Sequence, residues 1–102
     1  EITNGNKTAA PWVALAALSY DAGNREEFRQ VTSTLVRDHP NDKHAHYYYA
    51  VRQMEDGDYR GAEESLNRAR ELGMPEEDIS DMLRATIYAQ KWVWEYAGIV
   101  GG

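Results

Sequence analysis

The 102-residue sequence contains no cysteine. Disulfide bonds, thiolate nucleophiles and cysteine-ligated zinc are therefore excluded. No apolar stretch approaches the ~18 residues that a membrane-spanning helix requires. The longest such stretch, Trp12 to Leu18, also lacks the basic flank of a signal peptide. We therefore expect no membrane insertion, and the sequence leaves the cellular compartment unknown.

Basic residues are scarce as well. The chain has 11 lysines and arginines against 17 acidic residues, which gives a formal net charge of −6. A general nucleic-acid surface needs a basic face that releases condensed counterions, and an anionic bilayer attracts basic segments for the same electrostatic reason. We therefore expect no nucleic acid and no membrane surface as a partner. The length fits a single domain.

The residue types that carry catalysis or bind metals are present, but their spacing does not favour either. His39, His44 and His46 are close in sequence, yet His44 and His46 are two positions apart on a predicted helix and point to different faces. Acidic pairs fall at helix caps or on solvated faces, and no serine has the glycine-flanked turn of a hydrolase nucleophile. We predict no catalytic residue, no cofactor and no metal, and hence no enzyme.

Glycine and proline residues divide the chain into segments whose apolar spacing is typical of helices. The β-branched residues are scattered, so the sequence gives little indication of strands. Short loops, roughly two to four residues each, require neighbouring helices to be antiparallel. The capping and helix-breaking residues predict five helices. Their bounds are Thr8 to Gly23, Asn24 to Pro40, Asn41 or Asp42 to Gly57, Asp58 to Gly73, and Pro75 to Gly98. Apolar faces predicted from the spacing comprise Trp12, Leu15, Ala16 and Ser19, then Phe28, Val31, Leu35 and Val36, then Tyr59, Ala62, Leu66 and Ala69, with Tyr49 in the core.

Two stretches of the chain share one spacing. The interval from Gly23 to Gly57, here named the repeat interval, also separates Trp12, Leu15 and Ala16 from His46, Tyr49 and Ala50. A helix–turn–helix period of this length, about 34 residues, resembles the tetratricopeptide repeat (TPR) family. The resemblance implies an all-α, antiparallel helix-turn-helix array within one domain, residues 9–102, after a polar leader, residues 1–8. The predicted domain comprises two repeat units, residues 9–42 and 43–76, and a terminal capping helix of about residues 76–98.

The resemblance also implies a non-catalytic scaffold for protein–protein interaction. In this family the inner helix of each unit faces a concave groove that binds a peptide or a helix of a partner protein. The family's carboxylate-clamping lysine, asparagine and arginine are absent, so we expect an apolar-aromatic groove and a hydrophobic ligand. Carried over by position, the groove residues are Val13, Ala17, Tyr20, His44, Tyr47, Val51, Met54, Met82 and Thr86, with Ala89 beside them.

Two alternative functions stay open. The chain begins with Glu1 rather than methionine, so we interpret it as a mature or excised fragment, and one alternative is that it is a domain of a larger protein. It would then serve as an accessory or regulatory domain, for example of an enzyme. The other alternative is self-assembly as a homodimer through Trp92 and Trp94, in an apolar C-terminal segment that we otherwise expect to fold back over the second unit.

Overall fold

The computed structural model describes the backbone of residues 8–101 and the side chains of residues 8–92. Within that range the chain forms five helices and no strand, which confirms the predicted all-α fold. The helices are α1 (Ala10–Asp21), α2 (Arg25–Asp38), α3 (Lys43–Glu55), α4 (Tyr59–Glu71) and α5 (Glu76–Gly101). The predicted polar leader, except for Thr8, lies outside the described residues.

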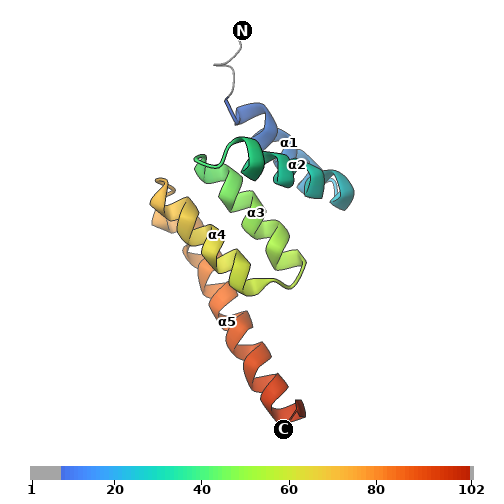
Figure 1. Ribbon diagram of the computed structural model, residues 1–102, viewed down its shortest axis with the longest axis vertical. Helices are drawn as coiled ribbons and strands as arrows, with labels where there is room; N and C mark the ends of the chain where they lie inside the picture. Colours follow the sequence, from blue (N-terminus) through green and yellow to red (C-terminus); the bar gives the residue numbers. More distant parts are fainter. Residues whose placement is uncertain (1–7, 102) are drawn as a thin grey trace.

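The helices pack in chain order. Contacts join α1 to α2 and α3 to α4 as two helical hairpins, and further contacts join α2 to α3, α4 to α5 and α1 to α3. The result is an elongated array with principal extents of 59 × 28 × 20 Å. Figure 1 shows α1 and α2 at one end and the C-terminal half of α5 extending alone beyond α4 at the other.

The two hairpin turns, one repeat interval apart, have the same structure. Gly23 and Gly57 both have positive φ, 73° and 82°. The residue after each glycine, Asn24 or Asp58, donates its backbone N–H to the carbonyl oxygen of Ser19 or Gln53, at 2.9 and 2.8 Å. The side chain of that same residue accepts a backbone N–H in the first turn of the next helix and caps it. A left-handed glycine thus closes one helix and an Asn or Asp opens the next.

The beginning of α1 differs slightly from the prediction. The helix starts at Ala10, and Ala9 rather than Thr8 occupies the N-cap position. The Thr8 hydroxyl still accepts the Ala10 N–H at 3.1 Å. Asp42, one repeat interval later, makes the corresponding bond to the His44 N–H at 2.8 Å at the start of α3. Thr8 therefore performs part of the predicted capping role.

The second helices of the two hairpins bury equivalent positions. Phe28, Thr32 and Leu35 of α2 and Ala62, Leu66 and Ala69 of α4 are all fully or almost fully buried. The predicted stripes are therefore correct, apart from Val36 and Tyr59, which are half-buried. Thr32 is the unpredicted core residue, and its hydroxyl donates to the Phe28 carbonyl oxygen at 2.8 Å, so burial leaves this hydroxyl paired.

Two aromatic side chains predicted for the core lie elsewhere. Trp12 is 39% exposed. Tyr49 is half-buried, and the Arg52 guanidinium lies 5.3 Å from its ring centroid. Tyr47 and Tyr48 pack against the core instead. Because α3 contacts α1, α2 and α4, three successive tyrosines meet different neighbours, and only contacts with distant parts of the chain decide which of them enters the core.

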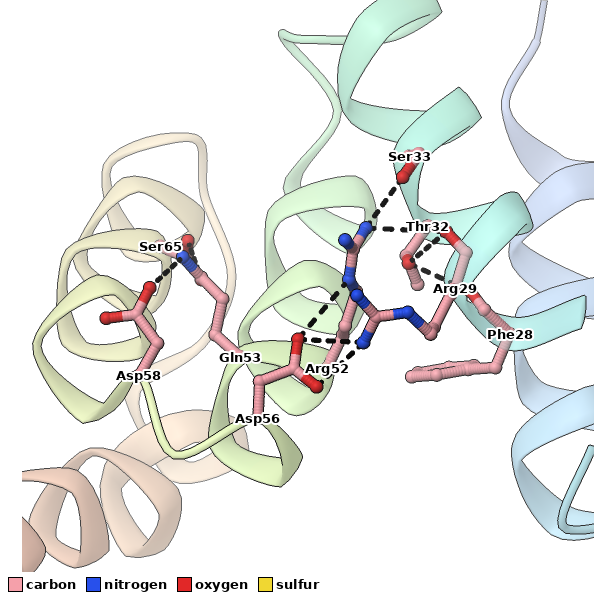
Figure 2. A network of polar contacts seen from close by, with 9 residues as sticks. All are labelled: Phe28, Arg29, Thr32, Ser33, Arg52, Gln53, Asp56, Asp58 and Ser65. Carbon is pink, nitrogen blue, oxygen red and sulfur yellow. Dashed lines mark hydrogen bonds and ion pairs between the residues drawn. The ribbon is translucent and has the colours of Figure 1, made fainter. Parts of the chain in front are cut away.

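The junctions between hairpins repeat with the same period. Arg29 of α2 donates to Asp56, the C-cap residue of α3, at 2.7 Å, and Gln90 of α5 donates to Glu63 of α4, also at 2.7 Å. Each member of the second pair stands one repeat interval after its counterpart in the first. Figure 2 shows the first junction, where Arg52 also reaches Asp56 from within α3. The helix α5 therefore docks on α4 as α3 docks on α2.

The C-terminal segment does not fold back within the described backbone. At Lys91, one repeat interval after Gly57, the chain continues as helix to Gly101, beyond the predicted end near Gly98. Trp92 is 62% exposed. Trp94 lies outside the residues whose side chains the structure describes.

The hairpin turn provides a direct test of the backbone requirement at Gly57. A Cβ there would meet no atom within 4 Å, so the only penalty of Gly57→Ala is the left-handed φ. We expect a loss of about 1 kcal/mol in the free energy of unfolding measured with urea. Gly57→Asn, which tolerates this conformation better, should lose less. Equal stability of the alanine variant and the wild type would contradict the assigned turn.

The junction equivalence predicts that the first pair of side chains can be transplanted to the second junction. Gln90→Asp alone places a carboxylate beside Glu63, and adding Glu63→Arg recreates the Arg29–Asp56 pair. A double-mutant cycle of unfolding free energies should give a favourable coupling of about 0.2–1 kcal/mol, weakened by salt. A coupling of zero at low salt would show that these two positions are not in contact.

Candidate functional site

Three helices bring four of the predicted groove residues to one apolar cluster. Val51 belongs to the cluster itself, and Val13 of α1, Tyr47 of α3 and Met82 of α5 pack against it. Tyr47 and Met82 also pack against the second cluster, around Leu66. These side chains thus connect the two hairpins and α5 along the side where α1 and α3 meet.

Two of the predicted groove residues offer almost no surface to a partner. Val51 is buried within the cluster that it shares with α1 and α2. Thr86 is fully buried, one i,i+7 step from buried Ile79 on the face of α5 that packs on α4, and its hydroxyl donates to the Leu83 carbonyl oxygen at 2.6 Å. Both predictions are corrected, because neighbouring helices cover these positions.

The other predicted groove residues retain accessible surface. Tyr20 is 46% exposed near the end of α1. His44 is exposed at the start of α3, with its Nδ1 3.6 Å from Asp42 Oδ1. Half-buried positions are Val13, Ala17, Tyr47, Met54, Met82 and Ala89.

Four aromatic rings form a continuous line beneath this surface, here named the aromatic line: Tyr20, Phe28, Tyr48 and Tyr47. Their successive centroids are 5.3, 6.4 and 5.2 Å apart, and the last two pairs meet edge to face. Tilted and edge-on contacts of this length are favourable for aromatic rings. Phe28 is buried, so the line is anchored in the core and reaches solvent chiefly at Tyr20.

Tyr20 and Tyr47 of the aromatic line were predicted as groove residues, whereas Tyr48 was not. Phe28, the fourth member, was predicted for the core. Burial raises the pKa of the Tyr48 hydroxyl, and neighbouring Tyr47 and Asp21 raise it further. Three consecutive tyrosines give no periodicity that singles out the middle one. The repeat does give a signal that Tyr48 is partly buried. Met82 follows Tyr48 by one repeat interval and also packs against the core.

Acidic side chains border the exposed end of the aromatic line. Asp21, the last residue of α1, is exposed and close enough to Tyr48 to affect its ionisation. Glu55, at the end of α3, is exposed and lines a hollow of about 30 Å³ together with Tyr20 and Phe28. That volume holds little more than a water molecule. Arg25 lines the same hollow, so the site is an aromatic surface whose rim carries the acidic side chains of Asp21 and Glu55 and the basic side chain of Arg25.

A larger hollow, about 410 Å³, lies over α2 and Arg52 and is lined by polar side chains. Its arginines already have partners. Arg29 and Arg52 both contact Asp56, and the Arg37 guanidinium hydrogen-bonded to Asp38 holds the pKa of that carboxyl below its usual value. Paired cations attract an anionic ligand weakly, so this hollow is a poorer candidate than the aromatic surface.

Within the part of the chain that the structure describes, no three histidine or acidic side chains gather in a way that could hold a metal ion. His46, for example, lies 2.6 Å from the Pro40 carbonyl oxygen. Across the same residues, no helix combines the length and hydropathy needed to cross a bilayer.

No protein-family model, curated protein or solved structure matches this chain. The assignment of a family and a function therefore depends on the geometry described above.

The raised pKa of Tyr48 predicts how stability responds to alkaline pH. A folded-state pKa above the unfolded value of about 10 means that the folded chain holds this proton more tightly. The associated stability is complete below pH ~10 and is lost as the pH rises through the folded-state pKa. Urea unfolding across this range should show a steeper loss for the wild type than for Tyr48→Phe, which keeps the ring beside Phe28. Identical pH dependence would contradict the burial of this hydroxyl.

Proposed function

We propose that the chain is a non-catalytic scaffold that binds an apolar segment of a partner protein, a peptide or a helix, on the surface around Tyr20. The observation that carries this proposal is the aromatic line, which is anchored in the core at Phe28 and exposed at Tyr20 beside Asp21 and Glu55. Aromatic rings offer a large contact area at low entropic cost, and they are enriched at protein interfaces.

We also propose that the array is TPR-like. The supporting features are the turns at Gly23 and Gly57, the caps at Asn24 and Asp58, and the paired junctions, each repeated after one repeat interval. In such an array the binding residues lie on the first helix of each unit, here α1, α3 and α5. The half-buried Val13 and Met82 then extend the proposed surface on either side of Tyr47.

The rim adds a preference for charge, because the two acidic side chains Asp21 and Glu55 outnumber the one basic side chain, Arg25. A partner with apolar residues on one face and lysine or arginine at its edge would place its cations near Asp21 and Glu55. The net charge of −6 would favour the approach of such a basic segment. Charges at the rim contribute more to the association rate and to specificity than to affinity, so apolar packing on Tyr20 supplies most of the binding energy in this proposal.

The test uses peptides selected against the wild-type chain from a displayed library, with binding measured by isothermal titration. We expect enrichment of sequences that combine apolar and basic residues. Tyr20→Ala should weaken binding about tenfold or more, because it removes the exposed aromatic anchor.

The matched control is Leu18→Ala, on the same helix and 65% exposed, but two positions away and so on a different face. It should bind the selected peptides as the wild type does, with helicity confirmed by circular dichroism for both variants. Equal binding by Tyr20→Ala and the wild type, or equal weakening by both variants, would place the peptide elsewhere and overturn the proposal.

Self-association is the second candidate function, favoured by the exposed side chains of α5. Tyr88 is 71% exposed and Trp92 is 62% exposed, one helical turn apart. Large aromatic side chains at the surface are typical of contacts between protein chains. An accessory role within a larger protein, the remaining alternative, is compatible with either surface.

A further inference from the structure

The outward face of α1 is unusual for the first helix of an array. The helix carries no charged residue before Asp21, and it exposes Pro11, Ala14 and Leu18. A helix that is apolar all round is normally buried, and the end helices of repeat arrays usually have a polar outer face. The exposed surface of α2, in contrast, carries charged side chains such as Arg37.

The positions one and two repeat intervals later in the chain indicate the role of this face. Pro11, Ala14 and Leu18 correspond to Ala45, Tyr48 and Arg52 in α3, and to Ile79, Met82 and Thr86 in α5. In α3 and α5 all of these positions are buried or half-buried, and those helices dock on α2 and α4 respectively. The face of α1 therefore has the positions and the apolar character of a junction, but no preceding helix covers it in the described part of the chain.

At the other end of the array, the backbone of α5 extends beyond α4 (Figure 1). After Gln90, which donates to Glu63 of α4, α5 continues to Gly101, which adds about 17 Å of helix. Ile87, Tyr88 and Trp92 are exposed where this extension begins. The helix α1 has 12 residues, about 18 Å, so the lengths match. Figure 1 places the two elements at opposite ends of the molecule, so one chain cannot join them.

We infer that the outward face of α1 binds the C-terminal half of α5 of a second copy of this chain. The contact continues the established junctions, with the incoming helix in the place that α2 occupies against α3. Charge does not oppose it, because α1 is uncharged before Asp21, and the charged residues of α5 after Arg84 are Lys91 and Glu95, which have opposite signs. Two acidic chains thus meet at faces that do not repel each other.

This inference deepens the self-association named above and is independent of the surface around Tyr20. The contact is heterologous, since two different faces meet, and repetition of such a contact produces open chains unless it closes into a ring. One helix pair buries less than the ~800 Å² per partner of a standard interface. We therefore expect weak association whose mean mass keeps rising with concentration.

The experiment is sedimentation velocity of the full chain from about 10 μM to about 1 mM, the range of weak association. Leu18→Glu blocks the α1 face, and Tyr88→Glu/Trp92→Glu blocks α5. Each variant should remain monomeric alone, because each has lost one side of the contact. An equimolar mixture of the two should form a 1:1 dimer that grows no further, because each copy retains one intact face.

The control is Gln30→Glu at an exposed position of α2, which adds one negative charge away from both proposed faces and should associate as the wild type does. Circular dichroism verifies that every variant is folded. The inference is overturned by a wild type that stays monomeric at the highest concentration, by a Leu18→Glu chain that still dimerises, or by a mixture that gives no dimer. Peptide binding is measured on the same variants to distinguish the two proposals. A variant that stays monomeric and still binds the selected peptides would support the Tyr20 surface independently of self-association.

Discussion

The docking of a first helix on the second helix of the preceding hairpin is the contact on which the described array depends. It occurs where α3 meets α2 and again where α5 meets α4, with paired polar side chains at equivalent positions. Two-helix hairpins are too small to bury a sufficient core alone, so stacking supplies the remaining apolar contact. Small residues such as Ala45 and Ala50 permit the close approach that this stacking requires.

The candidate binding surface is a consequence of the same stacking. Phe28 contributes to the core between α1 and α3, and its ring links Tyr20 of the first hairpin to Tyr48 of the second. The aromatic line therefore exists only when the two hairpins are docked. Burial of Phe28 fixes the core end of the line, and a preorganised surface loses less entropy when a partner binds.

Local chemistry explains which parts of the fold could be predicted from the sequence. The turns at Gly23 and Gly57, the caps at Asn24 and Asp58, and the buried faces of α2 and α4 depend on short-range signals and on strong amphipathic patterns. Helix α1 is apolar on every side and α3 carries consecutive tyrosines, so their periodicity does not select one face. Contacts between distant parts of the chain decide those faces. They exposed Trp12 and moved Tyr49 out of the core, and they buried Val51 and Thr86, which were predicted for the groove.

The central claim is that the hairpins dock through repeated junctions, and solution NMR of the dilute chain tests it most directly. Nuclear Overhauser contacts between the rings of Phe28 and Tyr48 report the first junction, and contacts between the side chains of Glu63 and Gln90 report the second. Both sets should appear together with the contacts inside each hairpin. Hairpin contacts without either junction would show two independent helical pairs and would contradict the account.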